Sequence, residues 1–190
     1  MHAARSGPLA GINIIDVIAA LAVTVVMAGA SAGCGGGQTT PQGPAYLLVG
    51  GAEASGDGFV PLTGDVTLVP GAQGGFHVWL KYRVTGMPAG PMRVRHSAAR
   101  AEDGRPVLVG QSRPVDIGAP GPDGAWEAPK AVPAFMCPAP VGTPIDGTPI
   151  KFRVELLDAN DHAVLSGDAE ATPHCPDGDQ ATFCAHICSG

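Results

Sequence analysis

The sequence lacks the features that would place it in several common functional classes. Its 11 basic side chains are outnumbered by 17 acidic ones, and this acidic balance repels nucleic acid and anionic lipid head groups. No serine lies in a nucleophile elbow, and no Gly-rich stretch joins a strand to a helix as phosphate binding requires. The acidic residues are too sparse for a Ca²⁺ loop. These absences predict a protein that is not an enzyme, requires no cofactor and binds no nucleic acid.

A long apolar segment is also missing. The apolar run at 17–27 has eleven residues, whereas a membrane-spanning helix needs roughly 20. Extending the run backwards would place the carboxylate of Asp16 in the bilayer, which is costly and argues against an uncleaved anchor. Arg5 precedes the run and small residues follow it, a composition typical of a secretory signal.

The stretch Ala30-Ser31-Ala32-Gly33-Cys34 ends this leader and resembles the lipobox of bacterial lipoproteins, with Ser31 where Leu is usual. The resemblance implies cleavage before Cys34, lipid on that residue and anchorage in the outer or inner membrane of the envelope. Ordinary cleavage after the small residues 28–30 or 30–32 is the alternative, and it would give a secreted soluble protein.

Cysteine parity supports lipidation. The chain has five cysteines, so a lipidated Cys34 leaves an even set of four, Cys137, Cys175, Cys184 and Cys188. Exported proteins pair their cysteines, and the four are expected to form disulfides.

The leader and the lipobox divide the chain into three parts. Residues 1–33 are the expected lipoprotein signal peptide, residues 34–44 form a tether rich in Gly, Pro and Thr, and residues 45–190 form one folded domain. The segments at 74–79 and 183–189 also resemble bacterial envelope lipoproteins, a resemblance that implies no activity.

The folded part alternates apolar and polar residues with a period of two. In the clearest strand, 76–84, the aromatic and aliphatic side chains fall on one face, while His77, Trp79, Lys81 and Arg83 fall on the other. Further strands are expected at 45–49, 65–69, 92–97, 106–110, 151–156 and 162–167, with a hairpin turn at 158–161 and long irregular loops at 116–132 and 138–148. About seven short strands predict an all-β fold, an immunoglobulin-like antiparallel β-sandwich.

The C-terminal tail is expected to be held to this sandwich by disulfides. Residues 180–187 favour a short helix, on which Cys184 and Cys188 would share one face and reach different partners. Cys137 and Cys175 are those partners, in an order that the sequence leaves open. The alternative is an envelope metal-binding protein that uses tail residues as ligands: His174, Cys175, Cys184, His186 and Cys188.

Two pairs of residues are candidates for ligand binding. His77 and Trp79 either lie under a loop or the tail, or are open to a ligand. Arg93 and Arg95 belong to a local basic strip that would suit an anionic glycan or the carboxylates of an envelope protein, although surface ion pairs are the simpler interpretation. The sequence thus favours a lipid-anchored envelope protein with a binding or structural domain. A secreted enzyme with a cleft that the sequence does not reveal is the remaining alternative.

Overall fold

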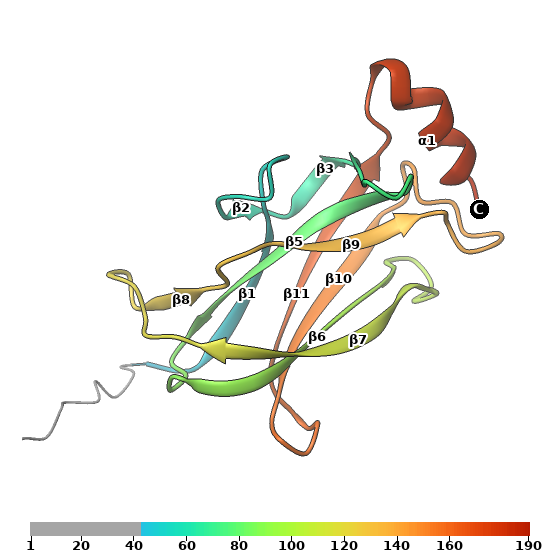
Figure 1. The fold of residues 1–190 in the computed structure, drawn as a ribbon. Coiled ribbons are helices and arrows are strands. Elements are labelled where there is room, and N and C mark those ends of the chain that lie inside the picture. Colours follow the sequence, from blue (N-terminus) through green and yellow to red (C-terminus); the bar gives the residue numbers. More distant parts are fainter. Residues whose placement is uncertain (1–42) are drawn as a thin grey trace, which may run out of the picture. The chain divides into compact units, whose positions relative to one another are not determined.

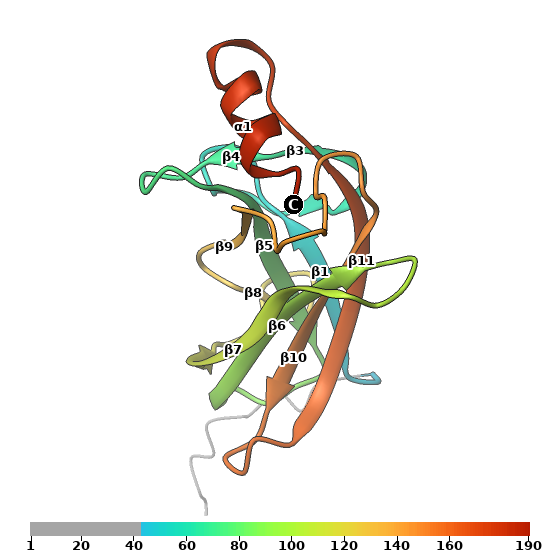
Figure 2. The ribbon, with the colours of Figure 1, turned by 90° about the vertical axis from the view of Figure 1, so that its right-hand side faces the viewer.

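The computed structural model describes residues 43–190, which form a β-sandwich with a short C-terminal helix (Figures 1 and 2). The predicted leader, Cys34 and most of the predicted tether lie outside the described residues. Sheet 1 contains β1 (Tyr46–Gly51), β2 (Val60–Pro61), β4 (Val69–Pro70), β5 (Phe76–Thr85), β8 (Ala125–Glu127) and β9 (Val132–Cys137). Sheet 2 contains, in spatial order, β3 (Thr63–Thr67), β11 (Ala163–His174), β10 (Ile150–Leu157), β6 (Gly90–Arg100) and β7 (Pro106–Ile117).

The prediction of an all-β, immunoglobulin-like sandwich is confirmed. One pairing departs from the antiparallel pattern, because β3 runs parallel to β11. The chain leaves sheet 1 after β2 and enters sheet 2 at β3, so its N-terminal part contributes to both sheets. The long connection between β3 and β11 is what permits a parallel pair.

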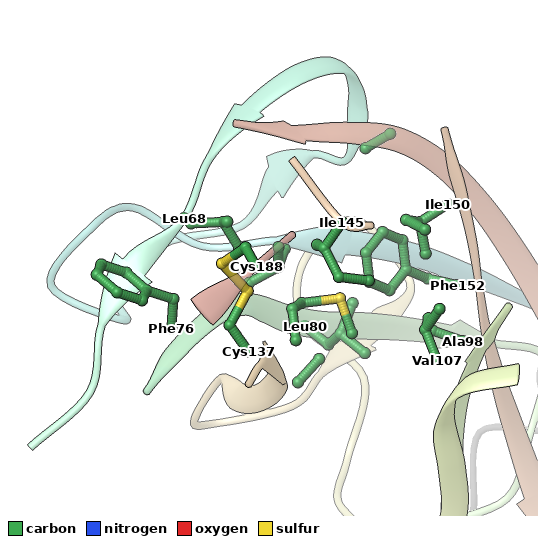
Figure 3. Packing of buried hydrophobic residues seen from close by; sticks show 14 of the residues in the cluster. Leu68, Phe76, Leu80, Ala98, Val107, Cys137, Ile145, Ile150, Phe152 and Cys188 are labelled. Atoms are coloured by element: carbon green, nitrogen blue, oxygen red, sulfur yellow. A yellow bond between two sulfur atoms is a disulfide. The ribbon is translucent and has the colours of Figure 1, made fainter. Parts of the chain in front are cut away.

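The predicted alternation places the core correctly. The inward residues of β5 are all buried: Phe76, Val78, Leu80, Tyr82 and Val84. Phe152, Val154 and Leu156 on β10 face them with no exposed surface. Near the C-terminal helix, the core continues around the disulfide between Cys137 and Cys188, which lies among Leu68, Leu80 and Ile145 (Figure 3).

Two strands differ from the sequence prediction. β7 continues to Ile117, well beyond the predicted end at residue 110. Gly110 and Pro114 do not end the strand because β7 lies at the edge of its sheet, where both residue types are accommodated. β9 lies between the two predicted loops, where no strand was predicted, and Pro133 is accommodated because β9 pairs only with β5. The predicted loop at 116–132 therefore begins in one strand and contains β8.

The tail forms α1 (Ala181–Ile187), as its sequence predicts, preceded by the short 3₁₀ helix η1 (Gly178–Gln180). The disulfides join Cys137 to Cys188 and Cys175 to Cys184, so the prediction that Cys184 and Cys188 bond other cysteines is confirmed. Their Sγ atoms are 3.6 Å apart on the same face of α1. Backbone bonds from Ala139 to Ile187 and from Ile145 to Cys188 hold the end of the helix against the loop after β9.

Candidate functional site

His77 and Trp79 project from the outer face of β5 and lie in contact with each other. The two rings meet edge to face with centroids 4.3 Å apart, and the ring of Phe135 lies 5.5 Å from that of His77. His77 is 4% exposed, and among residues 43–190 neither of its ring nitrogens has a hydrogen-bond partner. Burial lowers the pKa of this imidazole.

The loop at 52–59 lies against Trp79 on this face of β5, and Pro176 of the tail lines the same hollow beside the indole. The indole N–H of Trp79 donates to the carbonyl of Ala54, 3.2 Å away, and Gly56 lies against the ring. Lys81 Nζ donates to the carbonyl of Gly58 at 2.8 Å. Trp79 is therefore partly buried by a local loop.

The same face of β5 ends in an ion-pair cluster. Lys81 and Arg83 contact Glu127 of β8 at 2.6 and 2.7 Å, and the guanidinium of Arg83 lies 4.5 Å from the ring centroid of Phe59. Partial burial alone would raise the pKa of Glu127, but hydrogen bonds from Lys81 and Arg83 outweigh it and lower the pKa. This cluster holds the loop at 52–59 in place.

Arg93 and Arg95 lie on the outer face of the other sheet, where acidic side chains already pair with them. Arg93 is 3.0 Å from Asp161, and Arg95 donates to Glu155 at 2.8 Å. That hydrogen bond is the main reason that the pKa of Glu155 is lowered. The four ligand-binding candidates therefore do not form one site, and both arginines have carboxylate partners of their own.

A cleft that the sequence does not predict opens between β7 and β9, the edge strands of the two sheets. Its volume is about 360 Å³. The apolar lining comes from β5, β7 and β9: Leu80, Leu108, Val109, Val132, Pro133, Ala134 and Phe135. Four polar residues complete the lining: His96, Gln111, Ser112 and Arg113.

His96 is the buried polar group of this cleft, with 5% of its surface exposed. Its Nδ1 lies 3.3 Å from Nη2 of Arg113. Because a guanidinium only donates, Nδ1 accepts and the ring proton lies on Nε2. Nε2 has no hydrogen-bond partner in the described structure. Burial, together with the charge of Arg113, lowers the pKa of His96 to about 4, so the imidazole is neutral at neutral pH.

Arg113 supplies the positive charge of the cleft. Val94 of β6 is its register partner, which places Arg113 on the inner face of β7. Among residues 43–190 no carboxylate lies within ion-pair distance of it, in contrast to Arg93 and Arg95. An inward-pointing charge on an edge strand also discourages pairing with another chain.

The sequence contained part of the signal for this cleft. Alternation along 92–97 places His96 on the opposite face from Arg93 and Arg95 and turns it inward. Arg113 was missed because the predicted strand ended at residue 110. The opposite wall was missed because β9 has no polar and apolar alternation to mark it as a strand.

The tail sulfurs are committed to disulfides. In the described part of the chain, the only compact group of potential metal ligands is Cys175, Cys184 and Cys188, and all three are oxidised. The imidazole of His174 lies 3.3 Å from Asp65 and 3.6 Å from Asp146. The metal-binding alternative therefore has no thiolate to use.

None of the helices described in residues 43–190 is long and apolar enough to cross a membrane. Comparison of the chain with models of known protein families and with curated proteins finds no match.

Proposed function

We propose that this protein is a lipid-anchored component of the bacterial cell envelope, whose β-sandwich is a binding domain without catalytic activity. The pairing of the cysteines carries the proposal. The four cysteines at 137–188 bond one another, which leaves Cys34 as the odd cysteine of the sequence. Two disulfides are typical of an exported protein, and an odd cysteine directly after a secretory leader is the position that a lipoprotein modifies.

The cleft between β7 and β9 supports binding rather than catalysis. It has one buried imidazole and one guanidinium but no acidic side chain in its lining. The hydroxyl of Ser112 already accepts a hydrogen bond from Arg93 at 2.6 Å, and Nδ1 of His96 is engaged by Arg113. A nucleophile activated by a base that a third group orients is therefore missing from this lining.

Lipid attachment is tested by labelling cells with a palmitate analogue. Wild-type protein is expected to take up the label and to sediment with membranes, whereas Cys34→Ala loses the label. The control is Cys175→Ala/Cys184→Ala, which removes two cysteines of the folded domain and should keep the label. Equal labelling of wild type and Cys34→Ala, or soluble unlabelled wild-type protein, would contradict the proposal.

A further inference from the structure

We propose that the cleft between β7 and β9 binds a small carboxylate attached to an apolar body, with Arg113 and His96 holding the carboxylate. The inference rests on the proposed binding role of this domain and specifies its ligand. It depends on three features of the cleft: a buried hydrogen-bond donor with no acceptor in the described structure, the lack of acidic side chains in the lining and the apolar walls.

The hydrogen-bond donors of the cleft determine the sign of the charge on the ligand. Nε2 of His96 carries a proton, is buried and has no acceptor in the described structure. Leaving such a donor unsatisfied is unfavourable, and an acceptor that reaches it removes this cost. Arg113 adds a guanidinium with no carboxylate partner among residues 43–190, while no acidic residue lines the cleft. The site is therefore built for an anion and repels a cation.

The amount of charge favours a carboxylate. Arg113 contributes one positive charge, and the imidazole of His96 is neutral at neutral pH, so the cleft matches a monoanion. The planar guanidinium fork fits the two oxygens of a carboxylate, and such charge-assisted bonds are about twice as strong as neutral ones. A phosphate dianion would bring more negative charge than these two groups balance.

The walls determine the rest of the ligand. Seven apolar residues line the cleft, and two of them are exposed to solvent, Val109 at 79% and Phe135 at 48%. A volume of about 360 Å³ lies at the small end of the range for ligand sites. An apolar body in this space removes exposed hydrocarbon from water, which a bare inorganic anion does not do.

The inference is tested with hexanoate as the probe, added to the full purified protein while NMR follows each residue. Hexanoate is expected to shift the His96 imidazole and backbone amides of β7 and β9. Acetate keeps the charge and lacks the body, and hexylamine keeps the body and reverses the charge, so both are expected to bind at least about tenfold more weakly. The full lipid-anchored protein is kept in detergent micelles, so a control with empty micelles of that detergent measures how much of the probe partitions into them.

Variants assign the shifts to the two residues. Arg113→Gln and His96→Phe are each expected to weaken hexanoate binding by about tenfold or more. Lys151→Gln removes the same charge from the outer face of sheet 2 and is expected to bind like wild type. Unchanged near-ultraviolet circular dichroism shows that each variant is folded. If His96→Phe fails this check, the Arg113→Gln comparison decides the role of the charge.

Three results would overturn the inference. They are the absence of residue-specific shifts with hexanoate, equal binding of hexanoate and hexylamine, and equal binding of hexanoate and acetate. A lipid-labelled protein that fails to bind hexanoate would refute this inference and leave the lipid anchor standing. A soluble, unlabelled protein that binds hexanoate would refute the lipid anchor and leave this inference standing.

Discussion

At the scale of single residues, His96 links the cleft to the stability of the fold. The pKa of His96 is about 4 in the folded protein, against an ordinary value of 6.5, because burial and Arg113 disfavour the charged form. The unfolded chain therefore binds a proton that the folded protein does not. The stabilisation is fully present above about pH 6.5 and is lost progressively as the pH falls towards 4.

His96→Phe should remove this pH dependence. Between pH 7 and pH 4, the free energy of unfolding of wild type is expected to fall by on the order of 3 kcal/mol more than that of the variant. Denaturant titrations at several pH values measure the difference. His186→Gln, on the exposed surface of α1, serves as the control and should follow wild type. If the free energy of unfolding fell equally with pH for wild type and His96→Phe, folding would not lower the pKa of His96.

At the scale of elements, the loop at 52–59 is held by successive outward side chains of β5. Deleting residues 54–57 removes the carbonyl that accepts from Trp79 and the glycine that lies against its ring. In a Trp126→Phe background, the deletion is expected to shift the emission of Trp79 to the red and to increase its quenching by acrylamide, because the indole becomes exposed to water.

The matched control frees the tail instead of the loop. Cys175→Ala/Cys184→Ala in the same background breaks the disulfide that joins β11 to α1 and leaves residues 52–59 intact. The emission of Trp79 should stay as in the parent. A red shift in this control with none in the deletion would assign the cover to the tail.

The two disulfides should contribute unequally. The Cys137–Cys188 bond closes a loop with a sequence separation of 51, and Cys175–Cys184 one of 9. The chain-entropy estimate gives about 4 kcal/mol for the first and about 3 kcal/mol for the second. Thermal unfolding of the two double alanine variants measures the order. A larger loss for Cys175→Ala/Cys184→Ala would mean that contacts around the tail outweigh loop entropy.

At the scale of the whole molecule, the sequence predicted the sandwich and the tail but not the cleft. The alternation along β5 and β10 was sufficient because one face of each strand is buried in a single core. The four-residue spacing of Cys184 and Cys188 was sufficient to exclude a bond between them. Both predictions depend on local geometry that neighbouring residues determine.

The cleft depends on which strands end up at the edges of the two sheets. Its walls come from β7 and β9, which are far apart in sequence and are not paired with each other. The pattern along β5 and β10 likewise does not say whether those two strands pair. They belong to different sheets, so Glu155 of β10 binds Arg95, while Lys81 and Arg83 of β5 bind Glu127. Strand pairing is a long-range property that alternation does not encode.

The most direct test of a lipid-anchored, disulfide-bonded envelope protein is its intact mass after purification from membranes of cells that express the full gene. Free thiols are alkylated in denaturant without reductant, because the cysteines of the folded domain are largely buried. We expect a chain that begins at Cys34, carries the added mass of lipid on that residue and has no alkylated cysteine. A chain that begins at Met1, Ser31 or Gly33, or a Cys34 without lipid, would contradict it.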